Sequence, residues 1–160
     1  MLKKGTIGMK RTNKMIGIVD GDVLIYRACH RSIKENLDVK KTFDEIYEDV
    51  KLNTACDKYS LHVSGGGNFR KEIDQKFTVY KGKRKEKPDN YLTCRNYIIE
   101  KYKPIMVKNY EADDTAAIEA SKYIKDGQLY MLITVDKDWK TIGGLFYNLL
   151  HNNLSAVSTV

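Results

Sequence analysis

The sequence predicts an α/β fold in which helices flank a mostly parallel central sheet, and two observations lead to this prediction. Short apolar segments alternate along the chain with longer stretches of helical periodicity. Such alternation is typical of parallel sheets whose strands are joined by helices. One segment, LYMLITV at 129–135, is continuously apolar, as expected for a buried strand. The length of 160 residues suits one domain with one core.

The expected elements follow in chain order. Strands are expected at 15–19, 59–63, 104–107, 129–135 and 145–147, with a short extended piece at 77–80. Helices are expected at 23–33, at 88–102 with Pro88 in the first turn, and at 112–125. A further helix is expected to begin with Thr42 as its cap and Glu45 as the capping-box partner. The glycine-rich segment 64–68 is expected to be a loop, and 138–142 a helical turn.

Composition suggests three parts: a basic flexible tail at 1–14, a core at 15–148 and a poorly ordered C-terminal tail at 149–160. The start of the chain has no apolar region typical of a secretory signal, and no apolar run approaches the length of a membrane span. The three cysteines form no CxxC pair. We therefore expect buried or free thiols in a reducing cytoplasm, and no zinc site.

Charge favours a polyanionic partner. Lysine and arginine number 28 against 21 aspartates and glutamates, so the net charge is +7. Basic residues are concentrated between Arg70 and Lys87, and this cluster is suited to neutralising phosphates without reading base sequence. The alternative is that the cluster is an ordinary solvated surface segment.

Acidic residues follow three of the expected strands. Asp20 follows 15–19, a second group follows 104–107 and opens a helix, and a third follows 129–135. Ligands of open α/β sheets bind beyond the carboxyl ends of the strands, so these acids are expected to meet at one edge. Like charges gathered there repel unless cations lie among them, and Mg²⁺ or Mn²⁺ prefers oxygen ligands. The sequence therefore predicts a site for two divalent ions, with the ligands Asp20, Glu111, Asp113, Asp114, Asp136 and Asp138.

Local alternatives exist for each group of acids. Acidic residues are favoured in the first turn of any helix, which could explain Glu111–Asp114 without a metal. Asp136 could cap the helical turn that follows it, and Asp22 suits helix capping better than metal binding. Asp20-Gly21-Asp22 also resembles the DxD motif of aspartate-nucleophile phosphatases, but the other motifs of those enzymes are not found here.

Several motifs together resemble the 5′→3′ exonuclease and flap endonuclease family, which has a PIN-like core. The matching stretches lie within 15–148 and read IVDGDVLIYR (18–27), NFRKEI (68–73), YKGKRK (80–85), YEADDTAA (110–117) and TVDKDW (134–139). This family includes phage 5′ exonucleases and the 5′ nuclease domain of bacterial DNA polymerase I, so the resemblance implies the cytoplasm of a bacterium or of a phage-infected host cell.

The resemblance implies a structure-specific 5′→3′ exodeoxyribonuclease that hydrolyses phosphodiester bonds of DNA, and of RNA in hybrids, by a two-metal mechanism. It implies that the six acids named above bind the metal ions. It implies that Lys81 and Arg84 contact the scissile phosphate. The residues implied to bind nucleic acid are Arg70, Lys71, Tyr80, Lys81, Lys83, Arg84 and Lys85.

Two departures from the family open an alternative. The family usually has another acid in the loop before its FR motif, whereas residues 63–68 read VSGGGN. The family also continues into a helical region with a helix-hairpin-helix-like motif and further metal-binding aspartates, beyond the point where this sequence stops. A DNA-binding module that is weakly active or inactive is therefore the second hypothesis.

Overall fold

A five-stranded sheet forms the centre of the molecule, with the strand order β2-β1-β3-β4-β5. The computed structural model describes residues 14–66 and 87–157. The parallel strands are β1 (Met15–Asp20), β2 (Lys58–His62), β3 (Leu129–Thr134) and β4 (Gly144–Asn148). β5 (Asn153–Val157) is antiparallel to β4. The predicted α/β fold with a mostly parallel sheet is confirmed.

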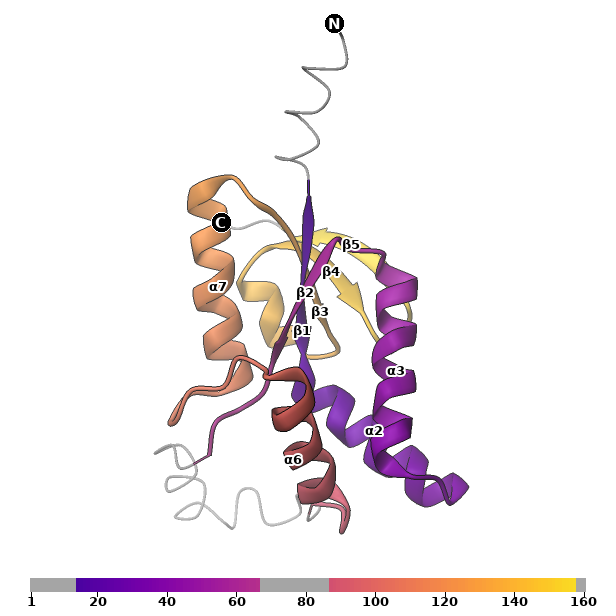
Figure 1. Cartoon of the computed structure of the whole chain (residues 1–160). Helices are drawn as coiled ribbons and strands as arrows, with labels where there is room; N and C mark the ends of the chain where they lie inside the picture. The colour runs from indigo at the N-terminus through magenta and orange to yellow at the C-terminus, as the bar shows by residue number, and fades with distance from the viewer. Residues whose placement is uncertain (1–13, 67–86, 158–160) are drawn as a thin grey trace, which may run out of the picture.

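Helices cover both faces of this sheet (Figure 1). The core on one face joins α2 (Gly21–Glu35), α3 (Val39–Thr54) and α6 (Tyr91–Tyr102) to strand residues such as Val19 and Ile133. The core on the other face joins α7 (Ala112–Asp126) and the 3₁₀ helix η1 (Lys137–Thr141) to Ile18 and Leu132. Successive strand residues point to opposite faces, so a continuously apolar strand fills both cores.

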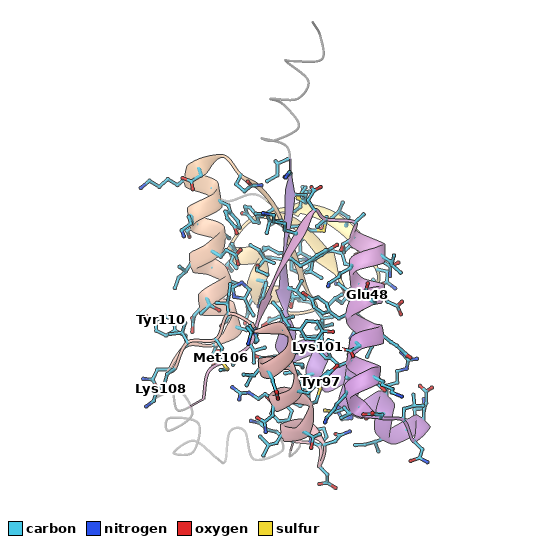
Figure 2. All side chains as sticks on the ribbon, in the orientation of Figure 1. Glu48, Tyr97, Lys101, Met106, Lys108 and Tyr110 are labelled. Atoms are coloured by element: carbon cyan, nitrogen blue, oxygen red, sulfur yellow. The ribbon has the colours of Figure 1, made fainter. Side chains whose placement is uncertain are left out.

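A polar cluster joins α3 to α6. Tyr97 and Lys101 of α6 lie beside α3 (Figure 2), where both donate hydrogen bonds to Asp44, and Tyr102 donates a third. Burial raises the pKa of Asp44, but these hydrogen bonds outweigh it, so the pKa is lowered. Asp44 therefore stays ionised and holds the two helices together.

The expected strand at 104–107 is wrong. Only Ile105 pairs with the sheet, through an isolated bridge to His62, in which its N–H donates to Leu61 O and its carbonyl accepts from Val63 N. Pro104 has no N–H to donate, and residues 105–107 are exposed, so no buried face holds this segment as a strand. Figure 2 shows Lys108 and Tyr110, which follow it, pointing away from the sheet.

Three helices begin at residues other than those expected. α3 begins before Thr42, because the Asp38 side chain accepts a hydrogen bond from Lys40 N at 2.9 Å and caps the helix. α6 begins at Tyr91 and not at Pro88, whose carbonyl closes a turn ahead of the helix. α2 begins at Gly21, directly after β1. A Cβ at Gly21 would lie 2.6 Å from His62 O, so glycine lets β1 lead into α2 close to β2.

The C-terminal segment also differs from the expectation of a poorly ordered tail. Residues 153–157 form β5, which pairs with β4 from Gly144↔Val157 to Asn148↔Asn153. The Asn148 side chain accepts hydrogen bonds from Leu150 N and His151 N, and Asn152 has a φ of 52°, which suits the tight turn. No helix in the described part of the chain is long and apolar enough to cross a membrane.

Candidate functional site

The carboxyl ends of β1 and β3 border a cavity of about 1190 Å³. The carboxyl groups among its lining residues belong to Asp20, Asp22, Asp49, Glu111, Asp113 and Asp136. Four of the six predicted metal ligands are therefore brought together: Asp20, Glu111, Asp113 and Asp136. The other two, Asp114 and Asp138, are not among the residues that line the cavity.

Asp20 is the most buried of these acids, with 5% of its surface exposed. It ends β1 and precedes the first turn of α2. Its carboxylate accepts a hydrogen bond of 2.7 Å from the Thr134 hydroxyl on β3. Burial raises the pKa of Asp20 to about 7, assisted by the negative charges of Asp22 and Asp136 and opposed by the Thr134 hydrogen bond. A cation in the cavity would offset this penalty on the ionised form.

Asp136 lines the cavity and also caps η1. Its Oδ1 accepts from Asp138 N at 2.9 Å, as the capping alternative predicts. Its own N–H donates to Thr134 Oγ1 at 3.0 Å. The Asp138 side chain is exposed to solvent. Capping by one oxygen leaves the other carboxylate oxygen of Asp136 for a second partner.

The first turn of α7 carries the third group of acids. Glu111 and Asp114 form a capping box, in which each side chain accepts from the backbone N–H of the other. The capping interpretation therefore applies to both residues, and Glu111 lines the cavity as well. Asp113 lies between the two capping residues and also lines the cavity. Glu111 thus caps α7 and lines the cavity at the same time.

Asp22 lines the cavity as well, although its place in the sequence favoured helix capping over metal binding. Its carboxylate accepts hydrogen bonds from the backbone N–H of Ser64, at 3.2 Å, and from the Ser64 hydroxyl. The Ser64 hydroxyl oxygen in turn accepts from Ala112 N at 3.0 Å. Ser64 thus joins the first turns of α2 and α7 beside the cavity. The signals in the sequence were the Asp-Gly-Asp at the junction of β1 and α2 and the serine in the acid-free loop.

Basic side chains of α2 form another wall of the same cavity. Arg27, His30 and Arg31 line it, together with Tyr26. They fall on one side of the helix because residues three and four apart are neighbours. Arg31 also forms ion pairs with Glu35 at 3.4 Å and Glu45 at 3.7 Å. The concentration of basic residues in the sequence pointed only to 70–87, although the helical spacing of Arg27, His30 and Arg31 in the segment after Asp20 was a usable signal.

The chemistry of this donor set fits a hard divalent cation. Carboxylate oxygens are the ligands that Mg²⁺ and Mn²⁺ prefer. Among residues 14–66 and 87–157, however, no group of three or more His, Cys, Asp or Glu side chains is close enough together to hold an ion directly. Mg²⁺ commonly keeps several waters and takes only one or two carboxylates of the protein, so the acids fit an ion held partly through water.

Solved structures with this arrangement of elements are known, although no protein-family model and no curated protein matches the sequence. A complex of the bacteriophage T5 D15 flap endonuclease with DNA and metal ions matches with a TM-score of 0.68 and 16% identity, over 89% of this chain and 58% of that chain. The T5 5′-exonuclease with bound zinc matches with a TM-score of 0.64 and 17% identity, over 89% and 58% of the two chains. The chain has the fold of a phage-type 5′ nuclease core.

This 5′ nuclease fold accounts for 89% of the chain, which spans little more than half of the T5 flap endonuclease, 58% of its length. The predicted nucleic-acid contacts lie outside the described residues: Arg70, Lys71, Tyr80, Lys81, Lys83, Arg84 and Lys85. The described structure resumes at Lys87, whose ammonium group lies over the Tyr91 ring at 4.6 Å. Tyr91 in turn contacts Tyr26 of the cavity wall, with ring centroids 5.3 Å apart.

Proposed function

We propose that this protein is a metal-dependent 5′→3′ exonuclease or flap endonuclease that hydrolyses phosphodiester bonds of DNA, with RNA in hybrids as a secondary substrate. The observation that carries this proposal is the buried carboxyl group of Asp20, which shares one cavity with Asp22, Glu111, Asp113 and Asp136. The fold is shared with T5 structures that were solved with metal ions and with DNA, which supports the same assignment.

In this proposal two Mg²⁺ or Mn²⁺ ions are held by Asp20, Glu111, Asp113 and Asp136. Asp114 and Asp138, which do not line the cavity, contribute their carboxylates from its edge. When bound, the ions supply an activated water and stabilise the leaving oxygen. The protein's part is to gather the carboxylates, to bury Asp20 and to orient Asp20 and Asp136 through Thr134. Asp22 supplies a further carboxylate, held by Ser64, next to a loop that has no acid of its own.

Cations on two sides of the acids would hold the DNA. Lys81 and Arg84 are proposed to contact the scissile phosphate, and the other basic residues of 70–85 to hold the strand. Support comes from Lys87, two residues beyond this segment, because its ammonium group lies over the ring of Tyr91, which contacts Tyr26 of the cavity wall. The Arg27 and Arg31 side chains of α2 give phosphates a second cationic surface in the cavity, and His30 lies beside them as a further hydrogen-bonding group.

A cleavage assay on 5′-labelled flap and duplex DNA tests this proposal. The parent should cleave with Mg²⁺ or Mn²⁺ and should stop when EDTA is added. Asp113→Ala should lose cleavage, whereas Asp126→Ala, an exposed acid at the other end of α7, should retain it. Equal cleavage by the parent and Asp113→Ala would remove the active-site assignment.

A DNA-binding module without turnover is the second candidate. It is favoured by the acid-free loop and by the finding that, in the part of the chain that the structure describes, no three ligands stand ready for one ion. Tight binding of flap DNA without cleavage, across Mg²⁺ and Mn²⁺ and several substrates, would support this candidate against the first.

A further inference from the structure

His62 is a fully buried histidine whose two ring nitrogens both contact α7. Nδ1 lies 2.8 Å from Thr115 Oγ1, and Nε2 lies 2.6 Å from Glu119 Oε1. Thr115 and Glu119 are four residues apart, which places them one above the other on the same side of the helix. One rigid ring therefore binds two successive turns of α7.

Glu119 collects further donors around this contact. The Ser60 hydroxyl of β2 donates to its Oε1 at 2.7 Å, and the Tyr123 hydroxyl donates to Oε2. Burial raises the pKa of Glu119, but the hydrogen bonds from His62, Tyr123 and Ser60 outweigh it, so the pKa is lowered. An ionised carboxylate only accepts, so Nε2 of His62 donates to it. β2 and α7 are joined by charge-assisted hydrogen bonds.

The fully buried apolar side chains of α7 that face the sheet are small, and only the partly buried Tyr123 ring, 6.3 Å from that of Tyr130, adds a large one among the described residues. Ala112, Ala116 and Ala120 are buried against Ile18 and Leu132. Alanines let the helix approach closely, but they offer few protruding groups that interlock with the strands. A helix that slips by one residue moves about 1.5 Å along its axis and turns by about 100°. The directional bonds of His62 resist such a slip where the alanines resist it weakly.

The consequence concerns the acids at the start of the same helix. Glu111 and Asp113 line the cavity from the first turn of α7, close to Thr115. His62 is the register partner of Asp20 in the pairing of β1 with β2. The bonds from His62 therefore connect α7, which carries Glu111 and Asp113 near its start, to the strand position that pairs with Asp20.

We propose that His62 is a positioning residue: by binding Thr115 and Glu119, it sets the axial position and rotation of α7 and so places Glu111 and Asp113 at the metal site. The part of this inference that concerns metal binding rests on the proposed function. It adds a residue, remote from the acids in sequence, that none of the metal-ligand predictions includes.

The test uses mild variants in the full chain. His62→Leu would leave the Glu119 charge buried without its partner and endanger the fold, so Thr115→Val and Glu119→Gln serve instead. Asp44→Asn is the matched control, because it weakens a comparable polar cluster between α3 and α6, away from α7. Mn²⁺ binding is measured by electron paramagnetic resonance at a temperature at which circular dichroism shows every variant folded. Amide hydrogen exchange of residues 110–117 is measured by mass spectrometry in EDTA.

We expect both α7 variants to bind Mn²⁺ roughly 10-fold more weakly than the parent, as is typical when support behind a ligand is lost. Exchange at 110–117 should be faster in both, and Asp44→Asn should change neither measurement. Unchanged Mn²⁺ affinity in both variants would overturn the inference, whether or not exchange is faster. If the parent itself binds no Mn²⁺ but exchange changes as expected, the proposed function fails while the role of His62 in fixing α7 stands.

Discussion

The hydroxyl of Thr134 on β3 donates a hydrogen bond of 2.7 Å to the buried carboxyl group of Asp20 on β1. The Thr134 hydroxyl oxygen also accepts a hydrogen bond from Asp136 N at 3.0 Å, so the Thr134 side chain orients two acids of the cavity. The bond favours the ionised form of Asp20 and opposes the rise in its pKa, to about 7, that burial causes.

Thr134→Val should raise the pKa of Asp20 above its present value of about 7, because the opposing hydrogen bond is lost while burial remains. Mn²⁺ affinity near pH 7 should fall, since more of the carboxyl group is protonated and must lose its proton on binding. A titration of Mn²⁺ at several pH values measures this effect. Thr134→Ser keeps the hydroxyl and should bind like the parent. A pH dependence shared by all three proteins would contradict the prediction.

Without metal, Asp20 should make the protein less stable as pH rises. Its pKa is about 7 in the folded protein against a usual value of 3.8, so the folded state holds the proton more tightly. The stabilisation from this tighter proton binding is complete below pH 3.8 and is lost as pH rises through 7. The free energy of unfolding falls over this interval by an amount on the order of 4 kcal/mol.

Asp20→Asn removes that dependence. In EDTA, the variant should be more stable than the parent at pH 8, and the difference should shrink at pH 5. Urea unfolding at both pH values measures the free energy of unfolding. The same variant should lose Mn²⁺ binding, so the ionised carboxylate would serve function at the expense of stability. Parallel pH profiles for the two proteins would show that the pKa of Asp20 is not raised.

The cationic side chains of α2 should contribute to DNA binding through phosphate contacts. Arg27→Ala and Arg31→Ala should each weaken binding of flap DNA and reduce the slope of log affinity against log salt by about 1. Fluorescence anisotropy in EDTA at several salt concentrations measures both quantities. Lys125→Ala, an exposed change in the last turn of α7, is the control. Equal slopes for Lys125→Ala and the arginine variants would show that Arg27 and Arg31 do not contact the DNA phosphates.

Ser64 should matter for stability and for metal binding together. Ser64→Ala removes the hydroxyl that donates to Asp22 and accepts from Ala112 N, and should cost about 1–2 kcal/mol of unfolding free energy. Mn²⁺ affinity should fall as well, because Asp22 loses the hydroxyl bond and is held at the cavity only by the backbone N–H of residue 64. Thermal unfolding and Mn²⁺ titration measure the two effects. Ser121→Ala, exposed on α7, should change neither.

The fold followed from the sequence where the pattern was long and repeated. The apolar segments 15–19, 129–135 and 145–147 became β1, β3 and β4, and the alanine-rich stretch became α7. The segment 104–107 has a similar local composition, but its residues 105–107 are exposed. It does not form a strand, because strand formation depends on packing against neighbours and on burial as well as on composition. Asn148 and Asn152 stabilise a turn after β4, and this turn lets residues 153–157 of the expected tail pair with β4 as β5.

By itself, the sequence determined the α/β class and the presence of acids at the carboxyl ends of β1 and β3 and in the first turn of α7. Only the tertiary structure decided which acids share the cavity, because Asp114 and Asp138 fall outside its lining while Asp22 joins it through Ser64. It also decided that His62 holds α7 through Glu119, which lies 57 residues away along the chain. Hydrophobic periodicity records which face of an element is buried, but partners so distant in sequence meet only when the chain has folded.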